Sequence, residues 1–115
     1  MITLYGISNC DTVKKARAWL TENGKNHAFH DFKKYGIAPE ELARWADAVG
    51  WESLLNRKGT TWRKLAVEEQ FAVHDQGSAL ALMQAQTSVI KRPVVDWGAG
   101  KFTVGFDPKT WEKRM

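Results

Sequence analysis

The chain has 115 residues, 43% of them hydrophobic and 26% charged, which suffices for the core of one globular domain and excludes a disordered chain. No apolar run approaches the roughly 20 residues of a membrane-spanning helix, so we expect no membrane contact. The formal net charge of +4 arises from basic residues scattered among acidic ones, which permits anion binding but does not indicate a nucleic-acid-binding tract.

The cysteine content indicates in which cellular compartment the protein resides. The chain contains one cysteine, so no disulfide can form within it. Its first residues do not show the pattern of a signal peptide. Because disulfide-free chains are typical of reducing compartments, we expect a cytoplasmic protein, and we expect it to be a monomer.

The first half of the chain alternates strand and helix patterns. Residues 2–5 form a short apolar run that predicts a buried strand, and residues 11–23 carry apolar side chains at helical spacing. Residues 27–32 predict a second strand, and Pro39 opens a helix that ends before Gly50. This order favours a βαβ unit with parallel strands.

The second half begins with short helical patterns and ends with a hairpin. Residues 51–88 contain several helical segments, including one over 78–84 that is rich in alanine and leucine. Two apolar runs, residues 94–97 and 101–106, are joined by a glycine turn, and an Asp-Pro pair then signals a final helix. We therefore predict an α/β fold with a mixed sheet in a single domain over residues 1–115, with a helical insertion at about 51–88 between the second helix and the C-terminal hairpin.

Cys10 lies where the first predicted strand gives way to the first predicted helix. A thiol in the first turn of a helix faces unpaired backbone N–H groups and the positive end of the helix dipole. Both favour the thiolate, which is the nucleophilic form, and Lys14 and Lys15 add positive charge within one helical turn. The alternative is that Cys10 is a buried small apolar residue, as isolated cysteines commonly are.

Cys10 has no C-x-x-C partner, because Asp11, Thr12 and Val13 follow it. Any disulfide that Cys10 forms must therefore link it to another molecule, such as glutathione or a second protein. Thr12 is a candidate donor of a hydrogen bond to the thiolate. It is equally a candidate for capping the N-terminus of the helix.

Two further segments hold candidate anion-binding residues. In the first, Arg92 precedes Pro93 at the mouth of an apolar strand, and its planar guanidinium suits a carboxylate, a phosphate or an arsenate. In the second, Arg57 and Lys58 form a basic pair in a loop before a predicted helix. For all three basic residues the alternative is a solvated surface side chain.

Histidines and tryptophans do not indicate a separate site. His27, His30 and His74 do not show metal-ligand spacing with one another or with Cys10, so we predict no metal site. Tryptophans can stack on nucleic-acid bases, but most of the six here fall at helical spacing beside other apolar residues, as Trp19 does. We interpret them as core residues.

Three stretches carry specific motifs. They are Tyr5-Gly6-Ile7-x-Asn9-Cys10-Asp11-Thr12-x-Lys14-Lys15-Ala16, then Leu54-Leu55-Asn56 with Gly59-Thr60-Thr61-Trp62-Arg63-Lys64-Leu65, and Ile90-Lys91-Arg92-Pro93, with Gly105-Phe106 as a further match. Over essentially its whole length the chain resembles the arsenate reductase (ArsC) family, and within it the YffB/Spx-like branch.

The resemblance implies a thioredoxin-like fold with a helical insertion. It also implies that Cys10 is the reactive thiol and that Pro93 is a cis-proline facing it. Arsenate reductases of this family use a cysteine and three arginines, and Arg92 matches one of these. Arg57 lies at the expected place of another, although some YffB-like relatives carry their arginine one position later, where Lys58 stands here.

The chain departs from the arsenate reductases at two positions. Phe106 occupies the place of the third arginine, and Gly6 occupies that of the histidine in their H-N-P-x-C segment. By analogy with the removal of an oxyanion-hole donor, losing one of three cationic ligands costs the transition state about 2–4 kcal/mol, a ~10²–10³-fold penalty in rate. This departure argues against arsenate as the physiological substrate.

The resemblance therefore favours a glutathione-dependent thiol reductase. Cys10 is its predicted catalytic residue and forms a mixed disulfide that glutathione, the co-substrate, resolves. We predict no tightly bound cofactor. The predicted substrate-binding residues are Asn9, Thr12, Arg57, Lys58, Arg92 and Pro93.

Two alternatives stay open. Spx-like relatives are transcriptional regulators that contact RNA polymerase, commonly as redox sensors with a C-x-x-C switch that this chain lacks. The other alternative is weak reduction of arsenate, an oxyanion, as a side activity. Neither alternative involves direct contact with nucleic acid, and we predict none.

Overall fold

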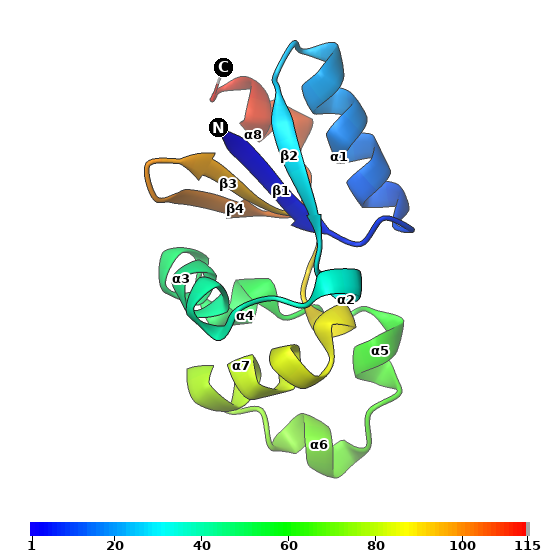
Figure 1. Ribbon diagram of the computed structural model, residues 1–115. Helices are drawn as coiled ribbons and strands as arrows, with labels where there is room; N and C mark the ends of the chain where they lie inside the picture. Colours follow the sequence, from blue (N-terminus) through cyan, green and yellow to red (C-terminus); the bar gives the residue numbers. More distant parts are fainter. Residues whose placement is uncertain (115) are drawn as a thin grey trace. The chain divides into compact units, whose positions relative to one another are not determined.

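The computed structural model describes residues 1–114 and divides into two compact units. The first unit joins Met1–Lys34 to the C-terminal segment that begins at Arg92, and the second is Tyr35–Lys91. The β-sheet belongs to the first unit, whereas the second is helical (Figure 1). Within residues 1–114, the helices are all too short or too polar to cross a membrane.

The sheet of the first unit has four strands in the order β2-β1-β3-β4. They are β1 (Ile2–Gly6), β2 (His27–Asp31), β3 (Val94–Gly98) and β4 (Lys101–Val104). Strands β1 and β2 are parallel, with Leu4 opposite Phe29, whereas the β1–β3 and β3–β4 pairs are antiparallel. The predicted mixed sheet, its parallel pair and its C-terminal hairpin are thus confirmed.

Two helices pack against this sheet: α1 (Asp11–Glu22) and α8 (Pro108–Glu112) (Figure 1). The Asp107 carboxylate caps α8, because it accepts hydrogen bonds from the Lys109 N–H at 3.1 Å and from the Thr110 hydroxyl at 2.7 Å. Both helices bury their apolar faces in one cluster with the sheet. Its fully buried members are Leu4, Val13, Ala16, Leu20, Val95 and Trp111.

Aromatic rings complete this core. The Trp111 ring meets three others edge-on, with centroid separations of 5.5 Å to Trp19, 5.0 Å to Trp97 and 4.9 Å to Phe106. In the second unit, Trp45 is fully buried. The interpretation of tryptophans as core residues is confirmed for Trp45 and Trp111, whereas Trp19 and Trp97 are partly buried and pack against the core.

The second unit consists of short helices. They are α3 (Pro39–Val49), α4 (Trp51–Leu54), α5 (Thr60–Arg63), α6 (Val67–Phe71), α7 (Gln76–Ala85) and the 3₁₀ turn η1 (Thr87–Val89). An antiparallel bridge between Leu55 and Ile90 ties the unit together, as does a 2.7 Å hydrogen bond from Lys91 N–H to the Leu54 carbonyl. The predicted insertion at about 51–88 is the larger part of this unit, which also includes α3.

The predicted end of the second strand is wrong by one residue. Strand β2 stops at Asp31, and Phe32 begins a one-turn helix, α2 (Phe32–Tyr35). The Asp31 carboxylate accepts hydrogen bonds from the N–H groups of Lys33 at 3.0 Å and Lys34 at 3.1 Å. Because an aspartate in this position caps a helical turn, the chain leaves the sheet before the apolar Phe32 can extend the strand.

Candidate active site

The loop after β1 brings Cys10 to the N-terminus of α1. Cys10 directly precedes the helix in an extended backbone conformation, and its carbonyl accepts a helical hydrogen bond from Lys14 N–H at 3.0 Å. The residue is partly exposed. The thiol therefore lies at a helix N-terminus within reach of solvent, and the predicted position at a strand-to-helix turn is confirmed.

Gly6 allows β1 and α1 to approach closely just before this loop. A Cβ atom at position 6 would lie 2.7 Å from Cγ2 of Val13, which is fully buried in the first turn of α1. Real Cβ contacts are not that short, so any side chain at position 6 would displace Val13 or the helix. The glycine is therefore a packing requirement of the segment that carries Cys10.

The pKa of the Cys10 thiol is held below its usual value. Partial burial of the sulfur is the largest single influence, and it raises the pKa. Hydrogen bonds from Val13 N–H, from the Arg92 side chain and from Thr12 N–H lower the pKa, as does the positive charge of Arg92, and together they outweigh burial. The thiolate is thus stabilised by the helix N-terminus and by one guanidinium.

Arg92 reaches Cys10 from the segment that leads into β3. The peptide bond between Arg92 and Pro93 is cis, as the resemblance implied. Pro93 is buried, and its carbonyl accepts a hydrogen bond from Gly105 N–H at 2.8 Å, just beyond the end of β4. The backbone of this segment is therefore anchored to the hairpin. Its Arg92 side chain, with its positive charge, lowers the pKa of the Cys10 thiol.

Asp31 fixes the loop that carries Cys10, and no sequence motif identified it. Its carboxylate accepts a hydrogen bond from Ser8 N–H at 3.1 Å, in addition to those from the first turn of α2. Burial raises the pKa of the Asp31 carboxyl, but hydrogen bonds from Ser8, Lys34 and Lys33 lower it more, so the net pKa lies below its usual value. The parallel strands offered a signal, since their carboxyl ends meet at one edge of the sheet and bring residue 31 beside the loop after β1.

The other two predicted residues of the first unit flank the thiol. Asn9 is exposed in the turn before Cys10, and Thr12 is exposed in the first turn of α1. Thr12 acts on the sulfur through its backbone N–H. Their part in substrate binding stays a prediction.

Arg57 and Lys58 belong to the second unit and lie in the loop between α4 and α5. The Arg57 guanidinium carbon lies 5.8 Å from the ring centroid of Trp51 and 5.7 Å from that of Trp62, which is within the range of cation–π attraction. Lys58 is exposed, and its N–H donates to Asn56 Oδ1 at 3.2 Å. Both residues line a cavity of about 250 Å³. Two indole rings thus orient Arg57, whereas the contact of Lys58 is made by its backbone.

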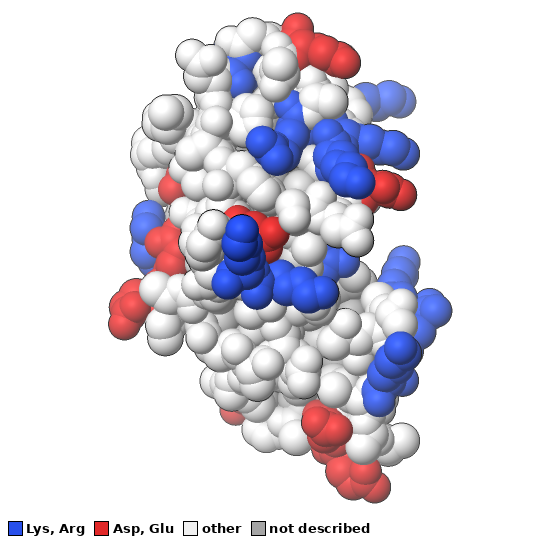
Figure 2. All heavy atoms as spheres, turned by 45° about the vertical axis from the view of Figure 1, so that its right-hand side comes forward, with Lys and Arg blue, Asp and Glu red and all other residues white. Residues whose placement is uncertain are grey.

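The described residues do not include a metal cluster, and the face drawn in Figure 2 carries side chains of both signs. No group of three or more histidine, cysteine, aspartate or glutamate side chains is placed to hold a metal ion within residues 1–114. Basic side chains on the face drawn in Figure 2 are interspersed with acidic ones. At the Cys10 site, the first unit presents one thiol beside one guanidinium.

A family model described as the ArsC family matches residues 5–114. The chain belongs to the ArsC family. A solved protein named YffB is 47% identical to this ArsC-family chain, with a TM-score of 0.92, and the match covers 98% of this chain and 97% of the other. An arsenate reductase (ArsC) related protein from Brucella melitensis is 51% identical with a TM-score of 0.77, over 97% of this chain and 92% of the other.

Similarity extends to a transcriptional regulator. The global transcriptional regulator Spx of Streptococcus agalactiae is 26% identical over 97 residues, which are 83% of this chain and 69% of that protein. The motif-based assignment to the ArsC family, near YffB and Spx, is therefore confirmed. The fold is the thioredoxin-like α/β fold of these relatives.

Proposed function

We propose that this ArsC-family protein is a glutathione-dependent thiol reductase that acts through Cys10. The observation that carries the proposal is the position of Cys10, which directly precedes α1 and has the Arg92 side chain near enough to lower the pKa of its thiol. This arrangement favours the thiolate, the form that attacks disulfides. The similarity to an arsenate reductase related protein supports a thiol-dependent oxidoreductase as the general class.

The proposed reaction has two thiol–disulfide exchanges at Cys10. The Cys10 thiolate attacks one sulfur of a substrate disulfide, forms a mixed disulfide with that sulfur and expels the other sulfur as a thiolate. A glutathione thiolate then attacks the substrate sulfur of the mixed disulfide, and Cys10 leaves as a thiolate. The proton that glutathione loses is taken up by the first leaving group. One substrate sulfur is thereby released as a thiol, and glutathione is oxidised to a mixed disulfide with the other substrate half. A second glutathione thiolate then attacks the glutathione sulfur of that mixed disulfide, which releases the other half as a thiol and forms glutathione disulfide.

The residues around Cys10 have distinct proposed roles. Arg92 stabilises the Cys10 thiolate before attack and again when it leaves in the second exchange. Arg92 binds a carboxylate of glutathione. Arg57 and Lys58 are assigned to glutathione binding from their motif positions alone. The backbone before Pro93 pairs with the peptide part of glutathione. Because the chain has one cysteine, the second thiol must come from another molecule.

Alkylation kinetics and intact mass test this proposal. The rate of Cys10 alkylation is measured over a wide pH range, and intact mass is recorded after addition of glutathione disulfide. We expect the rate to inflect below the ordinary thiol value of about pH 8.5, and we expect rapid gain of one glutathione. An inflection at the ordinary value, with no adduct, contradicts the mechanism and leaves a thioredoxin-like binding protein.

The similarity to Spx favours a second candidate, a regulator that binds RNA polymerase. Such a role requires a contact surface and does not require exchange at Cys10. Capture of purified RNA polymerase by wild-type and Cys10→Ser chains separates the two functions. Equal capture by both chains supports the regulator, whereas no capture by either leaves the reductase.

Phe106 weighs against arsenate reduction as the main activity. The centroid of its ring lies 4.9 Å from that of Trp111, and the side chain is partly buried against the core cluster of the first unit. A phenyl ring has no N–H or O–H to donate to an oxyanion, so the place of an arginine in arsenate reductases is taken here by a side chain that packs against the core.

A further inference from the structure

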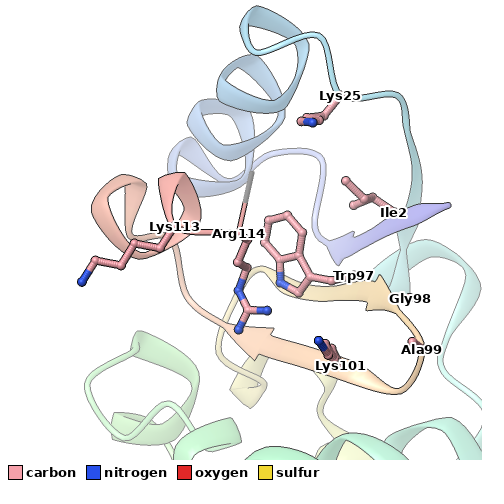
Figure 3. A pocket seen from close by; sticks show the side chains of 8 residues that line it. All are labelled: Ile2, Lys25, Trp97, Gly98, Ala99, Lys101, Lys113 and Arg114. Atoms are coloured by element: carbon pink, nitrogen blue, oxygen red, sulfur yellow. The ribbon is translucent and has the colours of Figure 1, made fainter.

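A second concave site lies in the first unit, at the end of the sheet where β1 begins. The cavity has a volume of about 700 Å³, with Ile2 and Trp97 among its walls (Figure 3). We call it the Trp97 pocket. Strand β1 separates it from the loop of Cys10, and the four-residue rise from Ile2 to Gly6 spans about 13 Å. The pocket is therefore distinct from the thiol site, and its function is independent of the proposed reductase activity.

The lining of the Trp97 pocket is strongly basic. Four cationic side chains line it, from the turn after α1, from β4 and from the end of α8: Lys25, Lys101, Lys113 and Arg114. No acidic side chain is among the described residues that line it. Four like charges around one cavity repel one another, so an anion in the cavity would relieve an unfavourable arrangement.

An irregular hairpin shapes this pocket. The register of β3 and β4 shifts between Asp96 and Gly98, which makes Trp97 the extra residue of a β-bulge. The Asp96 carboxylate accepts a hydrogen bond from Gly98 N–H at 2.8 Å, and Ala99 has a left-handed φ of +55°. These features turn the chain sharply and place the Lys101 side chain at the rim.

The Trp97 ring is fixed and in turn orients Arg114. Its Nε1–H donates to the Thr103 hydroxyl at 2.8 Å, and its ring meets Trp111 edge-on. The Arg114 guanidinium carbon lies 5.4 Å from the indole centroid. Figure 3 shows the Arg114 guanidinium beside the indole, whereas the Lys113 side chain points away from it. Arg114 is therefore the cation that the protein holds in place, and Lys113 is the peripheral one.

We propose that the Trp97 pocket binds small multiply charged phosphate compounds, such as those with a diphosphate group. An oriented guanidinium presents a fork of N–H donors that matches two phosphate oxygens. The ammonium groups of Lys25 and Lys101 are compact positive charges that can pair with further phosphate oxygens. A diphosphate carries several negative charges within a few ångströms, and this charge density matches a cavity lined by Lys25, Lys101 and Arg114 better than a single carboxylate does.

Titration with inorganic pyrophosphate tests the proposal on the full chain. The readout is the indole N–H resonance of Trp97, assigned by its loss in Trp97→Phe. We expect a saturable shift of this resonance at low salt, and weaker binding as salt is raised. Orthophosphate should bind less tightly than pyrophosphate. A shift that does not saturate, or equal affinity for citrate and pyrophosphate, overturns the assignment to phosphate compounds.

Matched variants locate the binding energy. Arg114→Gln should weaken pyrophosphate binding about tenfold, the loss expected for one charge-assisted hydrogen bond. Lys113→Gln should change the affinity for pyrophosphate less than about twofold, because an exposed, outward-pointing charge contributes little.

Lys109→Gln removes the same charge from α8 outside the pocket and is the control. Equal weakening by Lys109→Gln and Arg114→Gln would show charge screening instead of a site. Far-UV circular dichroism verifies that each variant folds, and Cys10→Ser should bind pyrophosphate like wild type.

Discussion

The sites at the two ends of β1 in the first unit, the Cys10 thiol and the Trp97 pocket, differ in how positive groups are arranged around negative charge. At the carboxyl end, the Cys10 sulfur is surrounded by donors in fixed positions, from the first turn of α1 and from Arg92. At the other end, the Trp97 pocket is lined by cations from separate segments, of which Arg114 is the one oriented by an aromatic ring. Donors gathered around one atom stabilise charge on that atom, whereas cations spread around a cavity suit an anion whose charge is spread over several atoms.

The largest expected effect that separates the two ends comes from Cys10→Ser. A serine hydroxyl is not nucleophilic toward disulfides at neutral pH, so glutathione adduct formation should vanish completely, as intact mass will show. Pyrophosphate binding at the Trp97 pocket should be unchanged. A residual adduct on the variant would mean that the modification is not on the thiol, and the reductase proposal would fail.

A smaller change is expected from Arg92→Gln. Removing the guanidinium takes away both a hydrogen bond and a positive charge from the sulfur, so the pKa of Cys10 should rise. At pH 7 a smaller fraction of the thiol is then ionised, and alkylation should slow several-fold. The inflection of the rate against pH should move upward.

Two controls accompany this variant. Arg92→Lys keeps the charge but not the fork of donors, so its inflection should fall between those of wild type and Arg92→Gln. Arg17→Gln removes an equal charge from α1, where Arg17 lies over the Phe29 ring at 4.3 Å, and should leave the inflection unchanged. An unmoved inflection in Arg92→Gln would refute the role given to Arg92.

Asp31→Ala should have the smallest effect of the three, on stability. The variant loses the acceptor for Ser8 N–H and for the first turn of α2, which should lower the free energy of unfolding by about 1 kcal/mol, the usual worth of a helix cap. Because the pKa of Asp31 is depressed in the fold, its contribution is present at neutral pH and disappears as pH falls through the folded pKa.

Urea unfolding at neutral and acidic pH measures this contribution. Wild type and Asp31→Ala should differ at neutral pH and converge in acid, once the wild-type carboxyl is protonated. A difference that persists unchanged in acid would mean that the side chain acts through packing, and not through its charge.

The placement of Cys10 could be predicted because its signals are local. The apolar run of β1, the polar turn and the helical spacing of α1 all lie within about twenty residues, and short-range patterns report such boundaries well. The hairpin and the Asp107 cap were predictable for the same reason.

Contacts between distant residues could not be predicted from local patterns. The hydrogen bond from Ser8 N–H to Asp31 joins residues 23 positions apart and depends on the parallel register of β1 with β2. The Trp97 pocket depends on a bulge in β3, and its cations come from three separate segments. The apolar character of Phe32 favours a strand when only the sequence is considered. The hydrogen bond from Lys33 N–H to the Asp31 carboxylate, which helps to begin the helical turn, depends on the folded backbone.

The contact between Gly6 and Val13 has a consequence for how such a chain can change over generations. Arsenate reductases carry a histidine where Gly6 stands, and here any side chain at that position meets Val13 at once. A substitution at position 6 alone meets a steric penalty, and shrinking Val13 first opens a void in a fully buried cluster. A change at position 6 and a change at Val13 are therefore coupled, and each costs more alone than in combination with the other.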